Sequence, residues 1–256
     1  MYIKSMNKKY CLSALAAFLL LFQSCNNSNK NQTSTEKEEV SVKEENPSET
    51  LAPKPQIGKP IADFIPKGYK IFQEIHGDLN KDGAEDCVVI IKGTNKENVI
   101  TDEDRGKLDR NRRGIIVLFK QNYNYIQAVK NYDCFSSENE DGGVYFPPDL
   151  EVSVEKGKLY VHYGHGRYGY WTYTFRHQKS DFELIGYDSS DNFGPVVNSE
   201  TSINFLTKKK VTKTNTNENA ESGDEVFEEK TEKIKVDKLI RLSEIKDFDE
   251  LEIRNE

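Results

Sequence analysis

The feature that most constrains the fold is a series of short apolar alternations, which begins near residue 57 and continues through most of the chain. Leu150, Val152 and Val154 alternate with polar residues, and after a Glu-Lys-Gly-Lys turn the alternation resumes at Leu159. A period of two places successive side chains on opposite faces of a β-strand. Two such runs joined by a short turn predict a β-hairpin.

Three further pairs of runs follow the same rule, over residues 115–129, 171–186 and 203–214. The continuous apolar run over 88–91 predicts a central strand covered on both faces. Only residues 241–250 favour a helix. The sequence therefore predicts one all-β domain over residues 57–256. We expect an antiparallel meander of hairpins that forms a curled sheet, a sandwich or a partial propeller, with a minor helix near the C-terminus.

The first 25 residues have the organisation of an export signal. Lys4, Lys8 and Lys9 precede an apolar run of eleven residues over 12–22, and a small residue before Cys25 follows it. A membrane-spanning helix needs about 20 apolar residues, so this run is too short to span and has the length of a cleaved signal. The chain is therefore expected to leave the cytoplasm.

This segment resembles bacterial signals cut by the lipoprotein peptidase, which leaves a lipidated cysteine as the first residue. The resemblance implies that residues 1–24 are a signal peptide and that Cys25 carries the lipid anchor. The protein would then face the periplasm from a membrane of the cell envelope. Asn26 is not the Asp that resembles an inner-membrane retention signal, which favours the outer membrane. The alternative is an ordinary secretory signal, or a membrane anchor, with an accidental cysteine.

Residues 25–56 are predicted to be a disordered tether between the lipid and the domain. They are rich in Asn, Ser, Lys, Glu, Thr and Pro. Such a segment cannot bury enough apolar surface to offset its ordering entropy. As a flexible coil it would span on the order of 30 Å, enough to hold a domain clear of the headgroups.

The charge of the exported chain excludes one class of partner. Removing residues 1–24 takes away three lysines and no acid, so the formal net charge moves from −7 to −10. Nucleic acid needs a basic face, and we therefore expect no nucleic-acid partner. Seven acidic residues fall within 217–232, which predicts an exposed acidic loop or the solvated edge of a late strand.

The cysteine count leaves two thiols in the domain. Cys11 leaves with the signal and Cys25 with the lipid, so Cys87 and Cys134 remain. An oxidising compartment would permit a disulfide between them. The alternative is two buried free thiols, because cysteine packs well in protein cores.

The sharpest motif is Asp-Leu-Asn-Lys-Asp-Gly-Ala-Glu-Asp over residues 78–86. Calcium prefers about six to eight oxygen ligands, which a tight loop supplies when alternate side chains turn inward and a glycine permits the bend. The predicted ligands are four side chains and one carbonyl: Asp78, Asn80, Asp82 and Asp86, with the carbonyl of Ala84. Position 12 is Val89, which excludes an EF-hand. The alternative is an Asn/Asp/Gly turn that binds nothing.

The 78–86 loop resembles the calcium loop between two strands in FG-GAP repeats of integrin-type β-propellers, where Asp-x-Asn-x-Asp-Gly-x-x-Asp precedes an apolar strand. The resemblance covers about fifteen residues, and a propeller would need several such loops. It implies a structural calcium ion at a strand junction.

A second resemblance rests on four short motifs, which are Asp-Gly-Gly-Val from residue 141, Tyr-Gly-His-Gly from 163, Trp-Thr-Tyr-Thr-Phe-Arg from 171 and Leu-Ile-Gly-Tyr from 184. Together with the 78–86 loop they resemble a family of uncharacterised bacterial exported proteins over most of residues 69–207. The resemblance implies the fold and the compartment, and no activity.

The densest aromatic stretch offers a candidate ligand platform formed by Tyr168, Tyr170, Trp171 and Tyr173. Exposed aromatic rings hold sugars and peptides in many proteins. Aromatic residues are also favoured in strands, so core packing is the alternative. His162 and His165 are three residues apart and would lie on opposite faces of a regular strand, which argues against a shared metal ion.

A basic cluster with interspersed acids is predicted to be a solvated loop rather than an anion site. Its basic members are Arg105, Lys107, Arg110, Arg112 and Arg113.

The sequence predicts a membrane-tethered envelope lipoprotein that acts as a calcium-stabilised binding or structural module, with an envelope protein or glycan as its partner. It contains no nucleophile elbow, phosphate loop, His-Glu-x-x-His or Cys-x-x-Cys. The rival prediction is a hydrolase that acts on envelope glycan or peptide through paired carboxylates. Two facing carboxylates in a cleft over the Trp171 strand would favour the hydrolase.

Overall fold

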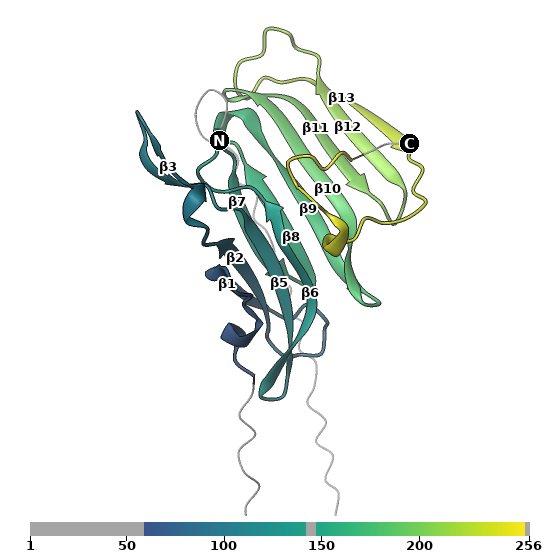
Figure 1. The fold of residues 1–256 in the computed structure, drawn as a ribbon. Helices are drawn as coiled ribbons and strands as arrows, with labels where there is room; N and C mark the ends of the chain where they lie inside the picture. The colour runs from purple at the N-terminus through teal and green to yellow at the C-terminus, as the bar shows by residue number, and fades with distance from the viewer. Residues whose placement is uncertain (1–58, 142–146, 254–256) are drawn as a thin grey trace, which may run out of the picture. The chain divides into compact units, whose positions relative to one another are not determined.

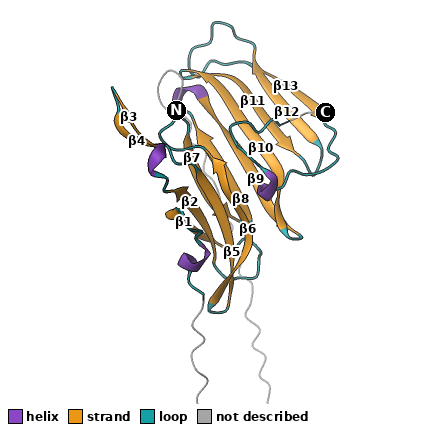
Figure 2. Ribbon diagram, in the orientation of Figure 1, coloured by secondary structure: helices purple, strands orange, loops and turns teal. Residues whose placement is uncertain are grey.

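The computed structural model describes residues 59–141 and 147–253, which belong to one compact unit over residues 53–256. Their regular elements are antiparallel strands and four short 3-10 helices, so the predicted all-β class is confirmed (Figures 1 and 2). The predicted signal peptide, Cys25 and the tether lie outside these residues.

The first sheet has four strands in the spatial order β1-β2-β5-β6. The strands are β1 (Tyr69–Gly77), β2 (Asp86–Gly93), β5 (Arg113–Gln121) and β6 (Asn124–Phe135). A separate hairpin of β3 (Val99–Asp102) and β4 (Gly106–Asp109) is inserted between β2 and β5. The 3-10 helix η1 (Ile61–Phe64) precedes this sheet, and η2 (Lys96–Asn98) precedes the hairpin.

The second sheet is a meander of seven strands in which each strand pairs with the next along the chain. The strands are β7 (Asp149–Glu155), β8 (Lys158–Gly164), β9 (Gly169–Gln178), β10 (Asp181–Phe193), β11 (Val196–Asn204), β12 (Lys209–Asn215) and β13 (Phe227–Lys233). The 3-10 helix η3 (Gly166–Tyr168) joins β8 to β9. All four predicted hairpins are present, as β5–β6, β7–β8, β9–β10 and β11–β12.

One hydrophobic core lies between the two sheets. It combines Val88, Ile90 and Val117 of the first sheet with Val161 and Phe175 of the second. The sheets also approach each other where β1 meets β7. A Cβ atom at Gly77 would lie 2.6 Å from Val154 Cγ1, so this contact requires glycine. The sandwich is therefore closest along one edge.

The opposite face of the first sheet carries a second, smaller group of buried residues, which we call the outer cluster: Cys87, Val89, Ile91, Ile116 and Leu118. Ile61, Phe64 and Ile65 of the segment before β1 pack against it. Because Val88 and Ile90 face the core while Val89 and Ile91 face the outer cluster, β2 is covered on both faces, as its continuous apolar run predicted.

The minor helix predicted near the C-terminus is present but shorter than the expected range of 241–250. The segment is irregular apart from the single 3-10 turn η4 (Leu242–Glu244). Backbone hydrogen bonds within the segment are confined to single turns, such as Glu244 N to Arg241 O at 3.0 Å. The segment and its flank also bond to strands: Leu184 N donates to Ile240 O at 2.8 Å, and Phe248 N donates to Cys134 O at 3.0 Å. This C-terminal segment thus connects β10 with β6, and it lies beside β10 in Figure 1.

The acidic segment over 217–232 is partly loop and partly strand. Residues 217–226 connect β12 to β13, and β13 forms the free edge of the second sheet. All seven residues of β13 are exposed, which agrees with the predicted solvated edge.

Candidate functional site

The 78–86 loop is a tight turn between β1 and β2 that its own side chains stabilise. Asp78 accepts hydrogen bonds from Lys81 N at 2.6 Å and from Gly83 N at 3.0 Å, while Asp82 accepts one from Ala84 N at 2.8 Å. Gly83 has φ +85°, so the bend falls at the predicted glycine. The aliphatic part of Lys81 lies against Gly157 of the β7–β8 turn.

Asp86 ties this loop to the sheet. It is fully buried at the start of β2, and its two oxygens accept from Leu79 N at 2.8 Å and Lys120 N at 2.9 Å. Burial raises the pKa of Asp86 above its ordinary value, although the backbone hydrogen bonds oppose the rise. A carboxylate oxygen has two lone pairs, so an oxygen that accepts one N–H bond retains capacity for a cation.

The oxygen donors of the loop are of the types that a hard cation prefers. Asp78, Asn80 and Asp82 belong to one tight turn and Asp86 is bonded at its end, but no group of three converging His, Cys, Asp or Glu donors among the described residues includes a loop carboxylate. The same hydrogen bonds are those of an Asn/Asp/Gly turn without an ion. The observed contacts are those of the turn alone, and an ion would have to draw the loop carboxylates toward one another.

The fold does not bring Cys87 and Cys134 together. Both are buried free thiols. Cys87 belongs to the outer cluster and Cys134 to the core between the sheets, so they lie on opposite faces of the first sheet. Burial, followed by the nearby Glu74 and Glu85 carboxylates, raises the pKa of Cys87 to about 12. The structure thus has two buried free thiols, which was the alternative to a disulfide. Buried thiols with a raised pKa are poor nucleophiles.

The four aromatic residues of the expected platform do not share one surface. Tyr173 is buried in the core, and Trp171 packs against that core with its ring stacked on Tyr163 at 5.4 Å. Tyr170 is 38% exposed and lies near His162, with ring centroids 5.5 Å apart. The strand period separates Tyr170 from its neighbours, so core packing accounts for two of the four rings.

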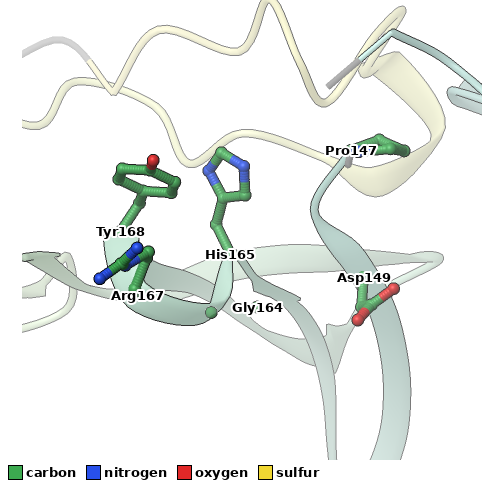
Figure 3. A pocket seen from close by; sticks show the side chains of 7 residues that line it. Pro147, Asp149, Gly164, His165, Arg167 and Tyr168 are labelled. Carbon is green, nitrogen blue, oxygen red and sulfur yellow. The ribbon is translucent and has the colours of Figure 1, made fainter. Parts of the chain in front are cut away.

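Tyr168 belongs instead to a pocket around η3. The pocket has a volume of about 380 Å³ and is lined by Pro147, Asp149, Gly164, His165, Gly166, Arg167 and Tyr168. Figure 3 shows the rings of His165 and Tyr168 on one side and Asp149 on another. The ring centroids of His165 and Tyr168 are 5.1 Å apart. Asp149 is the one carboxylate among the described lining residues, so this pocket does not present the facing pair that a hydrolase would need.

The two histidines of this region have separate surroundings. His162 shares a hydrogen bond of 2.7 Å with Thr172 Oγ1 on the neighbouring strand, whereas His165 lines the pocket. No cluster of potential metal ligands within the described residues contains either of them.

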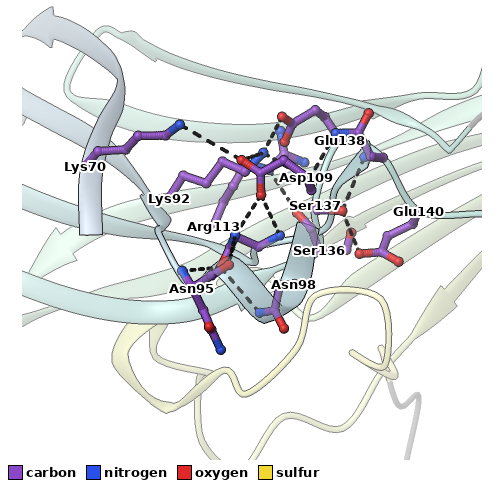
Figure 4. A network of polar contacts seen from close by, with 12 residues as sticks. Lys70, Lys92, Asn95, Asn98, Asp109, Arg113, Ser136, Ser137, Glu138 and Glu140 are labelled. Atoms are coloured by element: carbon purple, nitrogen blue, oxygen red, sulfur yellow. Dashed lines mark hydrogen bonds and ion pairs between the residues drawn. The ribbon is translucent and has the colours of Figure 1, made fainter. Parts of the chain in front are cut away.

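A polar network that the motifs did not reveal lies at the other end of β2. Lys92 is 2% exposed, and its Nζ contacts Asp109 Oδ2 at 3.2 Å and pairs with Glu138 (Figure 4). Burial would raise the pKa of Asp109, but hydrogen bonds from Asn111 and Lys92 outweigh it and lower that pKa. One local signal was present in the sequence: Lys92 directly follows the apolar run over 88–91, which indicates a charged side chain in a strand that is buried on both faces.

The predicted solvated basic loop is only partly solvated. Arg113 is 4% exposed and donates from Nε to Ser136 O at 2.8 Å, and its burial lowers its pKa. Arg110 pairs with Asp141 at 2.7 Å and Arg112 with Asp247 at 2.8 Å. Arg110 and Arg112 have carboxylate partners and Arg113 bonds a backbone carbonyl, so these arginines are engaged within the protein and do not form an anion site.

Comparison with protein-family models, curated proteins and solved structures found no match to this chain. Among the described residues there is no helix with the length and apolar character needed to cross a membrane.

Proposed function

We propose that this protein is a lipid-anchored lipoprotein of the cell envelope, and that its β-sandwich is a calcium-stabilised binding or structural module. Its partner is an envelope protein or glycan. The observation that carries the proposal is the position of Asp86. This residue is buried at the start of β2 and is bonded to both Leu79 and Lys120. An ion in the 78–86 loop would therefore strengthen the junction of β1, β2 and β5.

The role of the ion is structural, because the loop holds no group suited to chemistry on a substrate. Asp78, Asn80 and Asp82 all accept hydrogen bonds from the loop backbone, so their oxygens are committed to the turn. The pocket around η3 is the better candidate for ligand contact. Its Arg167, His165 and Tyr168 provide a cation, an imidazole and an aromatic ring at one end of the second sheet.

The calcium part is tested by thermal melting of the domain in millimolar calcium, magnesium or chelator. Extracellular calcium modules bind at about 10⁻⁴ to 10⁻³ M, and ligand at roughly ten times its dissociation constant adds about 1.4 kcal/mol. We expect calcium to raise the melting temperature by about 3–6 °C. Magnesium should raise it less, because the loop offers more ligands than an octahedral ion that keeps its waters can use.

Two variants make the calcium test specific. Asp82→Ala should abolish the response to calcium while the protein stays folded. Asp102→Ala is the matched control, since Asp102 accepts two backbone hydrogen bonds in the β3–β4 turn but lacks the ligand spacing. Equal melting temperatures in calcium and in chelator would contradict calcium binding, and the motif would then be an Asn/Asp/Gly turn that binds no ion.

The anchor is tested through Cys25. The variant Cys25→Ser should be released from the membrane fraction, because acyl chains provide the attachment. Mass spectrometry of the parent protein should find acyl groups on Cys25. A variant that stays in washed membranes, together with an unmodified Cys25 in the parent, would contradict the anchor and leave the calcium result unaffected.

A further inference from the structure

The antiparallel pair β1–β2 places three potential metal ligands on one face of the first sheet. His76 is directly opposite Cys87 in the register, and Glu74 is opposite Val89. Glu74 and His76 are two residues apart in one strand, so their side chains share a face. Directly opposed residues in an antiparallel pair have Cβ atoms about 4.5–5.5 Å apart, which brings Cys87 next to His76, and Glu74 is its diagonal neighbour on the same face.

The donor atoms of this group converge. The Cys87 sulfur, a ring nitrogen of His76 and a carboxylate oxygen of Glu74 all lie within 4.8 Å of one another, and His76 Nε2 is 3.8 Å from Glu74 Oε2. Cys87 is fully buried, whereas the side chains of His76 and Glu74 are 39% and 36% exposed. The thiol therefore forms the floor of the group, and the other two donors border solvent.

We propose that Glu74, His76 and Cys87 bind a thiophilic divalent cation of the zinc type. Zinc takes sulfur at about 2.3 Å and nitrogen or oxygen at about 2.0–2.2 Å in tetrahedral geometry. These lengths place ligand atoms about 3.3–3.6 Å apart around the ion. The donors therefore need to approach by about 1 Å, which rotation of the two partly exposed side chains supplies. Water fills the fourth position, and the thiol proton passes to solvent when sulfur binds the metal.

The ligand chemistry distinguishes this site from the 78–86 loop. Calcium prefers oxygen alone, whereas a thiolate and an imidazole select zinc and related soft or borderline ions. Although Asp86 and Cys87 are adjacent, their side chains lie on opposite faces of β2, with Asp86 bonded to Leu79 and Lys120. The two sites therefore occupy opposite faces of one strand, and each can be removed without the other.

The inference is tested by titrating Co²⁺, a spectroscopic substitute for Zn²⁺, into the full chain in a non-chelating reductant. Cys11→Ser and Cys25→Ser are included so that Cys87 and Cys134 are the remaining thiols. We expect one Co²⁺ per chain, a thiolate-to-cobalt absorption band, and displacement of the band by Zn²⁺ but not by Ca²⁺. His76→Gln should weaken binding by at least about 10–100-fold, and Cys87→Ser should remove the band.

Three controls define the site. Cys134→Ser removes the thiol of the opposite face, His165→Gln removes a histidine outside the group, and Asp82→Ala disables the calcium loop; all three should keep the band. Because Cys87 is buried and its variant can misfold, His76→Gln at a partly exposed position gives the independent result. A band that survives in both His76→Gln and Cys87→Ser, or Co²⁺ binding with no thiolate band, would overturn the proposal.

Discussion

The strands β2 and β13 have opposite compositions and lie in opposite environments. Seven of the eight residues of β2 are buried, whereas every residue of β13 is exposed. β2 lies between β1 and β5 with side chains in both hydrophobic groups, while β13 is the free edge of the second sheet. The buried Lys92 and Asp86 and the candidate ligand Cys87 all belong to β2. A strand covered on both faces thus holds buried polar groups, whereas the free edge strand holds none.

The largest expected effect is the difference between two variants, one that removes a buried aromatic ring and one that removes an exposed ring. Phe135 is fully buried and stacks on Phe248 at 4.9 Å, whereas Phe227 in β13 is 40% exposed. Phe135→Ala should lower the free energy of unfolding by about 3–5 kcal/mol, and Phe227→Ala by less than about 1 kcal/mol. Denaturant unfolding measures both. Similar losses would show that the edge strand is as firmly held as the core.

A smaller effect is expected from removing the partners of the buried lysine. Asp109→Asn combined with Glu138→Gln leaves Lys92 buried without a carboxylate, which should cost about 3 kcal/mol, because the partners are themselves partly solvated. Adding Lys92→Met should recover most of this loss, since an apolar side chain needs no partner there.

The matched surface pair is Lys213 with Glu200, which are 44% and 41% exposed on β12 and β11. Glu200→Gln should cause no measurable loss of stability, because exposed ion pairs contribute little. A loss equal to that of the Lys92 network would remove the distinction between the two regions.

The smallest expected effect is a pH dependence from His177. Its ring packs edge-on against Phe119 with centroids 4.7 Å apart, and burial lowers its pKa. The folded state therefore binds its proton less readily than the unfolded state does. Stability should fall as the pH drops through the unfolded value of about 6.5, and should be fully present above it. Between pH 7.5 and 5.5 the melting temperature of His177→Gln should change less with pH than that of the parent protein. An equal change in both proteins would assign the pH dependence to other groups.

The parts of the fold predicted from sequence are those that depend on neighbours along the chain. The β7–β8 hairpin follows from period two and from a turn in which Lys156 and Gly157 both adopt positive φ. The helix over 241–250 is only one 3-10 turn long, although Leu242, Ile245 and Phe248 recur at a spacing of three, which imitates one helical face. In the structure these side chains enter the core while the backbone bonds to β6 and β10, so tertiary contacts override the local pattern.

The candidate sites divide in the same way. The 78–86 loop was readable because its oxygens are contiguous in sequence. The contact of Lys92 with Glu138 spans 46 residues, and the approach of His76 to Cys87 depends on the β1–β2 register. Neither contact could be predicted from residues that are neighbours in the sequence. The expected aromatic platform failed because the strand period places Tyr170 and Trp171 on different faces.

Phe248 has a consequence for the order in which the protein can mature. Its ring lies against Phe135, Tyr173 and Phe175, all of which are synthesised before it. The aromatic centre of the sandwich cannot close until this residue has been synthesised, so a nascent chain that lacks it remains open. We expect chains that stop at residue 239 to stay sensitive to protease and chains that stop at residue 253 to resist it.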